Sequence, residues 1–159
     1  MTIRAWRITK ARLVDSAFTG DGAKAYGGRW NSVGHAVVYT AGSESLAILE
    51  TLVHLSAWDI LKQSYVVFEV SFDERLVENI KLSELPSSWR DSPSSVAVQQ
   101  VGDDWIARGS SAVLQLPSAI VPAEWNFLLN PMHRDFSRIT IGHFREVQLD
   151  PRLVKTNTP

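Results

Sequence analysis

Several short segments of this chain are rich in apolar residues, some of them alternating with polar ones, and such segments predict buried or half-buried β-strands. The segments with this pattern are residues 3–8, 35–40, 65–72, 112–116 with an extension to 121, 136–141 and 144–149, and residues 124–129 fit either a strand or one helical turn. Residues 44–57 and 93–108 carry apolar positions at helical spacing instead. The sequence therefore predicts a single α+β domain, mostly strands with two or three helices.

The predicted helix over residues 44–57 holds a carboxylate among apolar neighbours. Ser43 is suited to cap the first turn of this helix. Apolar residues fill almost the whole circumference around Glu50, and a helix that is apolar nearly all round is expected to be buried. Burying an unpaired carboxylate is costly, so we expect Glu50 either to have a task in a cleft or to form an ion pair with Arg7 or Arg29.

A glycine-rich loop is predicted over residues 19–31, and it ends in Gly27-Gly28-Arg29-Trp30-Asn31. Glycines let a backbone approach a ligand closely, and the guanidinium of Arg29 is a planar fork suited to phosphate. The alternative is a turn in which Arg29 caps a carbonyl group. Tyr39, at the end of the next predicted strand, could stack on a flat ring or bond a ribose, or it is a half-buried core tyrosine. Together with Glu50, this set suits a ligand with phosphate and aromatic groups, for which NAD⁺ is the obvious candidate.

Two further polar residues lie within apolar surroundings. Ser118 interrupts the apolar segment 116–122, where its hydroxyl could bond a ligand or its own backbone. Asn126 is flanked by large apolar residues, so we expect it to be buried and to need hydrogen-bond partners.

Composition narrows the classes of function. The 159 residues include 16 Lys and Arg and 17 Asp and Glu, so the net charge of −1 gives no basic field to attract nucleic acid. The absence of cysteine excludes thiol catalysis and cysteine-ligated zinc. We expect neither a signal peptide nor a membrane span, which is compatible with a cytoplasmic protein.

The sequence gives little support for a Rossmann dinucleotide site, a metal site or a two-carboxylate glycosidase. Gly20-Asp21-Gly22-Ala23-Lys24-Ala25 fits a dinucleotide fingerprint, but no strand clearly precedes it and no helix is predicted after it. Glu50 and His54 are spaced for a metal, but the four histidines are scattered, so no metal is expected. A glycosidase needs two carboxylates beside the bond, and only Glu50 is predicted to be buried.

At this point the chain resembles the RES domain family, named for its arginine, glutamate and serine. The resemblance covers about residues 4–150 and rests on Trp6-Arg7-Ile8, Gly27-Gly28-Arg29-Trp30-Asn31, Val38-Tyr39, Leu49-Glu50, Pro117-Ser118, Pro122, Glu124, Asn126 and Asn130-Pro131. One departure is Met132-His133 after Asn130-Pro131, where the family commonly has His-Pro.

The resemblance implies a fold similar to ADP-ribosyltransferases, a split β-structure with the helices around an NAD⁺ cleft. It implies the toxin of a bacterial toxin–antitoxin pair, which destroys NAD⁺ or, in some members, ADP-ribosylates a protein. Matched by position, the catalytic roles fall on Glu50, Arg29 and Tyr39, and the NAD⁺-binding roles fall on Arg29, Tyr39, Ser118, Asn126, Gly28 and Arg7.

We therefore expect an NAD⁺ glycohydrolase that cleaves the nicotinamide N-glycosidic bond, with NAD⁺ as substrate and no metal. The alternatives are a mono-ADP-ribosyltransferase acting on a host-cell protein and a non-catalytic module that binds a nucleotide or a partner. The expected partner is an Xre-family antitoxin, with no direct nucleic-acid or membrane contact, and a homodimer within the toxin–antitoxin complex is compatible with this scheme. The RES domain is expected to span residues 1–154, with a disordered tail over 155–159.

Overall fold

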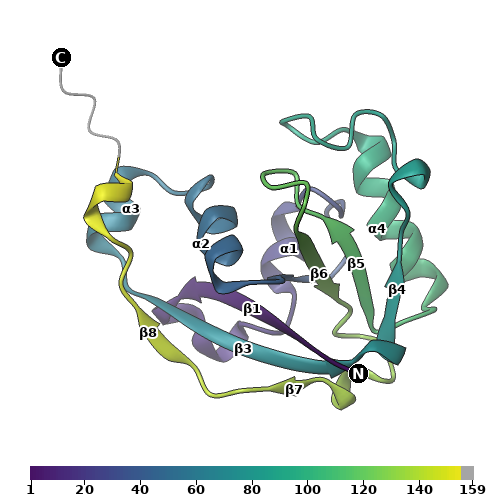
Figure 1. Cartoon of the computed structure of the whole chain (residues 1–159), viewed down its shortest axis with the longest axis horizontal. Coiled ribbons are helices and arrows are strands. Elements are labelled where there is room, and N and C mark those ends of the chain that lie inside the picture. Colours follow the sequence, from purple (N-terminus) through teal and green to yellow (C-terminus); the bar gives the residue numbers. More distant parts are fainter. Residues whose placement is uncertain (155–159) are drawn as a thin grey trace.

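An eight-stranded sheet organises the computed structural model, which describes residues 1–154 (Figure 1). The strands are β1 (Thr2–Lys10), β2 (Val38–Ala41), β3 (Tyr65–Asp73), β4 (Val77–Asn79), β5 (Val113–Pro117), β6 (Trp125–Leu129), β7 (Thr140–Ile141) and β8 (Arg145–Val147). The helices are α1 (Asp21–Tyr26), α2 (Glu44–Leu52), α3 (Ala57–Lys62) and α4 (Val96–Arg108). The predicted single α+β domain is confirmed, with four α-helices in place of the two or three expected, and the predicted tail over 155–159 lies outside the described residues.

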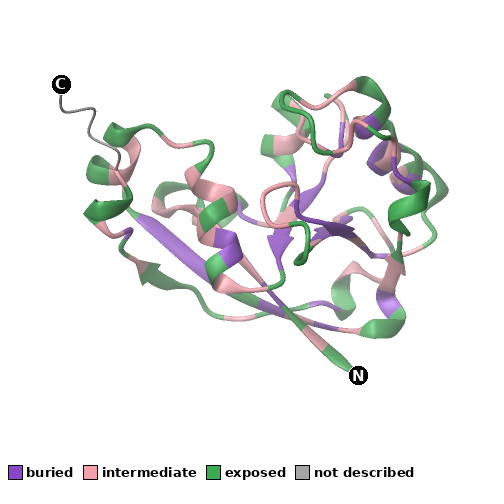
Figure 2. Cartoon of the chain, turned by 45° about the horizontal axis from the view of Figure 1, so that its top comes forward, coloured by how far each residue is buried: buried purple, intermediate pink, exposed green. Residues whose placement is uncertain are grey.

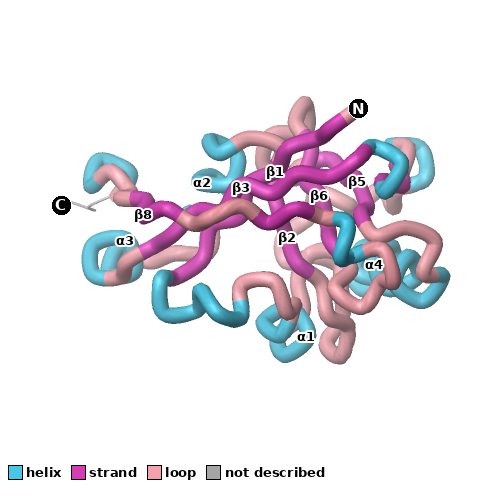
Figure 3. Tube along the Cα trace, turned by 90° about the horizontal axis from the view of Figure 1, so that it is seen from below, coloured by secondary structure: helices cyan, strands magenta, loops and turns pink. Residues whose placement is uncertain are grey.

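The sheet is nearly divided in two at its centre. Its strands follow the order β4-β5-β6-β2-β1-β3-β7, with β8 also paired to β3, and all neighbours are antiparallel except β4 and β5. β1 pairs with β3 along its whole length, but with β2 it shares a single register pair, Trp6 with Ala41. Figure 3 shows the result, with α3 and β8 at one end of the molecule and α4 with β5 at the other. This is the split arrangement that the sequence led us to expect.

The two faces of the sheet carry different cores. On one face, buried side chains of both halves of the sheet, including Ala5, Val38 and Phe127, form a single cluster. On the other, which we call the helix face, α4 packs through Val98 and Trp105 against β5 and β6. α2 packs against the same face near Ala41, because Leu46 and Ala47 cluster with that residue. Both α2 and α4 therefore cover the helix face, at different places along it.

Helix α2 begins where the sequence predicts and ends early. Ser43 accepts a hydrogen bond from the N–H of Leu46, so the predicted cap is confirmed. The expectation that this helix is buried all round was wrong, because its buried residues are only Leu46 and Ala47, while Leu49 and Val53 are 41% and 60% exposed. The physical reason is that α2 packs mainly against β1 and β2, and no second layer of the described residues covers its outer side (Figure 2).

The rest of the predicted helix over 44–57 is replaced by a turn and a separate helix. Ser56 and Asp59 form a reciprocal capping box that starts α3, and such a cap defines a new helix N-terminus. None of the helices within residues 1–154 combines the length and apolar character that a membrane span would need.

Other boundaries also differ from the prediction. Residues 21–26, predicted as loop, form α1, and residues 118–121 leave the strand, because the Ser118 hydroxyl takes up backbone N–H groups that a ladder would use. Residues 136–141 are mostly a 3₁₀ turn (Phe136–Arg138) followed by the short β7. Residues 124–129, left open between strand and helix, are the strand β6.

Candidate active site

Glu50 is held by two neutral donors that share one of its oxygens. The Ser118 hydroxyl donates to Oε1 of Glu50 at 2.7 Å, and Nδ2 of Asn126 donates to the same atom at 2.6 Å. The second oxygen, Oε2, makes no hydrogen bond within residues 1–154, and the side chain is half-buried. The ion pair with Arg7 or Arg29 is not formed in the described part of the chain, so Glu50 is anchored through Oε1 alone and not neutralised.

The strand register explains why these residues meet. Asn126 of β6 lies opposite Ala41 of β2, and residues directly opposite in an antiparallel pair project from the same face. Ala41 packs under Leu46 and Ala47 of α2, so the next turn of that helix brings Glu50 over Asn126. Glu50 thus reaches the sheet at the point where β2 ends and α2 begins.

The Ser118 hydroxyl is fully used. It accepts the backbone N–H groups of Ile120 at 3.1 Å and Val121 at 3.0 Å, and its own proton goes to Glu50. A hydroxyl has one donor and two acceptor sites, so none is left for a ligand. The structure therefore has the second interpretation of Ser118, a bond to its own backbone, and the same hydroxyl also orients the Glu50 carboxylate.

Tyr39 is anchored by its hydroxyl in the loop that precedes β2. The hydroxyl donates to Oδ1 of Asn31 at 2.6 Å and accepts the backbone N–H of Trp30 at 3.1 Å. Burial raises the pKa of Tyr39 above its usual range, against the opposite effects of the Trp30 hydrogen bond and the Arg29 charge. Gly28 makes this contact possible, because a Cβ there would lie 2.6 Å from Oη of Tyr39. The absence of a side chain at Gly28 thus serves packing against Tyr39 within the protein.

Tyr39 lies beside the Glu50 cluster on the helix face. It is two residues before Ala41 on β2, and alternate residues of a strand share a face. Its register partner is Leu128, so Asn126 is its diagonal neighbour, and such pairs lie about 7–8 Å apart. Tyr39 and the Glu50 cluster therefore lie on the same face of the sheet, with Tyr39 as the diagonal neighbour of Asn126.

Arg29 makes the carbonyl contacts that the second interpretation of this residue foresaw. Its Nη1 donates to the carbonyl oxygens of Trp89 at 3.0 Å and Asp91 at 2.8 Å. Nε and Nη2 make no hydrogen bond among the described residues, so part of the guanidinium fork remains open to an anion.

Arg7 lies on the other face of the sheet. Trp6 packs with Ala41 on the helix face, so the next residue along β1 points the opposite way. The Arg7 guanidinium donates to the carbonyls of Ala17 at 2.5 Å and Tyr39 at 3.0 Å, and burial lowers its pKa to about 10. Arg7 therefore touches the candidate site only through the backbone of Tyr39.

The structure brings some of the predicted site residues together and leaves others apart. Glu50, Ser118 and Asn126 form one cluster. Tyr39 lies on the same face of the sheet with Gly28 against its hydroxyl, while Arg29 is anchored on the carbonyls of Trp89 and Asp91.

Helix α4 supplies residues of the site region that the sequence analysis missed. Nε2 of Gln99 donates to the carbonyls of Gly28 and Asn31, and the buried carboxylate of Asp103 accepts from the backbone N–H and hydroxyl of Ser32. Apolar and polar residues are interspersed along α4, so nothing in the sequence distinguishes Gln99 and Asp103 from surface residues. The loop that carries Arg29 is therefore fixed by α4.

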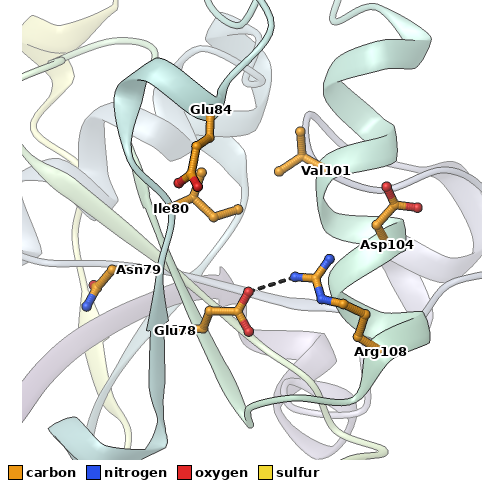
Figure 4. A pocket seen from close by; sticks show the side chains of 7 residues that line it. All are labelled: Glu78, Asn79, Ile80, Glu84, Val101, Asp104 and Arg108. Carbon is orange, nitrogen blue, oxygen red and sulfur yellow. Dashed lines mark hydrogen bonds and ion pairs between the residues drawn. The ribbon is translucent and has the colours of Figure 1, made fainter.

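A depression of about 420 Å³ lies elsewhere, between β4 and α4 (Figure 4). Its lining includes Glu78, Glu84 and Asp104, and Arg108 closes one side by donating to Glu78 at 2.7 Å. None of the candidate site residues lines it. Over residues 1–154, no three His, Asp or Glu side chains gather as a metal site would require.

Replacing Tyr39 by phenylalanine is expected to lower the free energy of unfolding by about 2 kcal/mol, because the Trp30 N–H and Asn31 Oδ1 lose their partner while buried. Urea denaturation measures this change. Tyr26 is 88% exposed, so Tyr26→Phe is the matched control and should leave the free energy unchanged. Equal stability of the two variants would contradict the anchoring role of the Tyr39 hydroxyl.

Comparison with known proteins gives consistent results. The family model described as RES domain matches residues 4–150. The chain is 39% identical over 151 residues to "Toxin Res" of Photorhabdus laumondii, covering 94% of this chain and 96% of that protein. It is 38% identical over 160 residues to "Prs ADP-ribosylating toxin" of Sphingobium sp. strain YBL2, covering 98% and 99%.

A solved structure shares the fold. The M. tuberculosis MbcT–MbcA toxin–antitoxin complex contains a chain that superposes with a TM-score of 0.76 at 17% identity, covering 96% of this chain and 87% of that one. The curated relatives match almost the whole sequence, and the family match over residues 4–150 includes every residue of the site described above. This chain therefore belongs to the RES domain family.

Proposed function

We propose that the protein is the toxin of a toxin–antitoxin pair and that it cleaves NAD⁺ between nicotinamide and ribose. The observation that carries this proposal is the Glu50 carboxylate, fixed through Oε1 by Ser118 and Asn126 with Oε2 unpartnered by the described residues. The name of one relative supports a toxin, and the name of another, an ADP-ribosylating toxin, supports a reaction that breaks this bond.

Cleavage of the N-glycosidic bond of NAD⁺ can be catalysed by a single fixed carboxylate such as Glu50. Nicotinamide departs as a neutral molecule when the N-glycosidic bond breaks, and positive charge develops on the ribose. A preorganised negative charge beside the sugar stabilises that transition state. Water then adds to the anomeric carbon and loses a proton, so NAD⁺ and water yield ADP-ribose, nicotinamide and one proton. In this scheme Glu50 supplies the charge.

The other residues would act around that centre. Arg29 would hold the pyrophosphate with the guanidinium nitrogens that its carbonyl contacts leave open. Tyr39 would pack its ring on the nicotinamide or its ribose, since its hydroxyl is engaged within the protein. The hydroxyl of Ser118 is saturated, so we propose it as a positioning residue that acts through Glu50. Gly28 would act by making room for Tyr39, and Arg7 by supporting β2 from the far face.

A second candidate is transfer of ADP-ribose to a protein. The observation that favours it is the relative named "Prs ADP-ribosylating toxin", which matches this chain over almost its full length. Both reactions break the same bond at the same carboxylate and differ only in whether water or a protein side chain attacks. A third candidate, a non-catalytic module on the same fold, would bind NAD⁺ without consuming it.

The test is to incubate the purified protein with NAD⁺ and to measure NAD⁺ loss, nicotinamide release and free ADP-ribose. Equal amounts of nicotinamide and ADP-ribose support hydrolysis. Nicotinamide release only when a cell extract is added, with labelled protein, supports transfer. If the protein binds NAD⁺ but consumes none, with or without cell extract, the non-catalytic binding module is the remaining candidate.

A toxin of this kind needs a neutralising partner, and we propose an Xre-type antitoxin that blocks the Glu50 site in a cytoplasmic complex, in which the toxin could also pair with a second copy of itself. The likeness of the fold to the MbcT–MbcA complex supports the presence of an antitoxin. Co-expression of the gene next to this one should restore growth to cells that produce the toxin, and failure to do so would contradict this part of the proposal.

Exchanging Arg29 for lysine is expected to lower kcat/KM for NAD⁺ by about 10–100-fold, because the single ammonium nitrogen lacks the planar fork whose other nitrogens could bind a phosphate while Nη1 keeps its two carbonyls. Arg12 is exposed, so Arg12→Lys controls for the loss of a guanidinium elsewhere. Steady-state kinetics with thermal denaturation of each variant separates the two roles of Arg29. Unchanged kinetics in the Arg29 variant would remove it from the proposed phosphate site.

A further inference from the structure

One acceptor at the candidate site is buried without a partner. Oδ1 of Asn126 makes no hydrogen bond, and it is the only buried side-chain nitrogen or oxygen within residues 1–154 in that condition. Buried polar atoms are almost always paired, because an unpaired one loses its bonds to water and gains nothing. The unpaired Oδ1 of Asn126 lies beside the Glu50 carboxylate, so a bound ligand is the natural source of its missing donor.

The orientation of the Asn126 amide follows from its neighbours. Ser118 accepts two backbone N–H groups, so its proton must point at Oε1 of Glu50 and that oxygen must be an acceptor. Only the Nδ2 end of Asn126 can then face Oε1 at 2.6 Å, since the reverse orientation would set two acceptors against each other. The unpaired atom is thus the carbonyl oxygen, and it needs a donor.

Two neighbouring side chains of the site therefore each carry an acceptor that has no partner among residues 1–154. Oε2 of Glu50 is the first and Oδ1 of Asn126 is the second, and the two side chains are joined by the bond from Nδ2 to Oε1. A ligand that satisfies both must offer two adjacent hydrogen-bond donors and no acceptor-only group there. The two hydroxyls of a ribose cis-diol have that character.

We propose that Asn126 is a specificity-determining residue, whose Oδ1 accepts one hydroxyl of the ribose beside the scissile bond while Glu50 accepts the other. This inference rests on the proposed function and deepens it, because it restricts the substrates to ribonucleotides with both hydroxyls on that sugar. A deoxyribose would leave Oδ1 buried and unpaired in the complex, and sites that bond a substrate hydroxyl reject analogues that lack it.

The test compares NAD⁺ with two analogues in which the nicotinamide ribose lacks either the 2′ or the 3′ hydroxyl. For each, kcat/KM for nicotinamide release is measured with the wild type, Asn126→Ala and the control Asn79→Ala. Asn79 is an exposed strand asparagine on β4, so the control makes the same change far from Glu50. Dividing the NAD⁺-to-analogue ratio of the wild type by that of the variant cancels the intrinsic reactivity of each analogue.

For one of the two hydroxyls, the preference for NAD⁺ should be about 10-fold or more larger in the wild type and Asn79→Ala than in Asn126→Ala. Asn126→Leu, which removes the unpaired acceptor and keeps the branched shape of the side chain, should lose the same preference and guards against a folding defect of the alanine variant. Nicotinamide release from NAD⁺ with equal preferences in all variants overturns the inference and leaves the proposed function standing. Absence of any NAD⁺ cleavage by the wild type would overturn both.

Discussion

Replacing Glu50 by glutamine is expected to lower NAD⁺ turnover by about 10²–10³-fold while the protein stays folded, because the variant loses a preorganised charge and almost nothing else. The shape is kept, and the amide oxygen of glutamine still accepts from Ser118 and Asn126. Those two donors direct the new NH₂ group to the place of Oε2, which has no partner among the described residues. The ribose would then face a neutral donor where a negative charge had stabilised the oxocarbenium ion.

The measurement is nicotinamide release at saturating and limiting NAD⁺, with circular dichroism to verify the fold. Glu44→Gln is the matched control, because it removes the same charge from the first turn of the same helix at a side chain paired with Arg145. The control is expected to keep its turnover. Near-normal turnover in the Glu50 variant would exclude it as the catalytic group, and retained NAD⁺ binding without any wild-type turnover would identify a binding module.

The sequence indicates Glu50, Ser118 and Asn126 one by one, and it cannot show that they share one oxygen. Glu50 lies 68 residues from Ser118 and 76 from Asn126 in the chain, so their meeting depends on which strands pair and in what register. The order β5-β6-β2 and the pairing of Asn126 with Ala41 decide it. Hydrophobic patterns locate strands, but they carry little information on which strand lies next to which.

Gly28 shows a different limit. The sequence suggests a glycine that lets a ligand approach, and the structure shows a glycine that lets Tyr39 approach. Both demand the same residue, since each needs the space that a Cβ would fill. Only the position of β2 relative to the loop distinguishes them. The same limit applies to helix α2. A helix that is apolar all round is buried only where other elements cover it, and the sequence does not show which elements do so.

Gly102→Ala is expected to lower the free energy of unfolding by about 3 kcal/mol or more, the largest stability loss foreseen from adding one methyl group to this chain. A Cβ at Gly102 would lie 1.9 Å from the carbonyl oxygen of Trp30 and 3.0 Å from its carbonyl carbon. Both are backbone atoms, so no side-chain rotation relieves the clash, and α4 must move away from the loop. The gain of about 1 kcal/mol in helix propensity is too small to compensate.

Thermal denaturation measures the effect, and 3 kcal/mol in a domain of this size corresponds to a fall in Tm of about 6–12 °C. Gly22→Ala in α1 is the matched control, because its Cβ would meet nothing within 4 Å and the substitution should be neutral or slightly stabilising. Trp30 also donates its N–H to Tyr39, so the displaced loop should carry Tyr39 and Arg29 with it and reduce NAD⁺ turnover at temperatures where the variant is still folded. A variant as stable as the wild type would show that the contact between α4 and the loop does not hold the site. A variant that is destabilised but fully active would show that the site tolerates movement of the loop, which would count against the placement of Arg29 and Tyr39 beside the substrate.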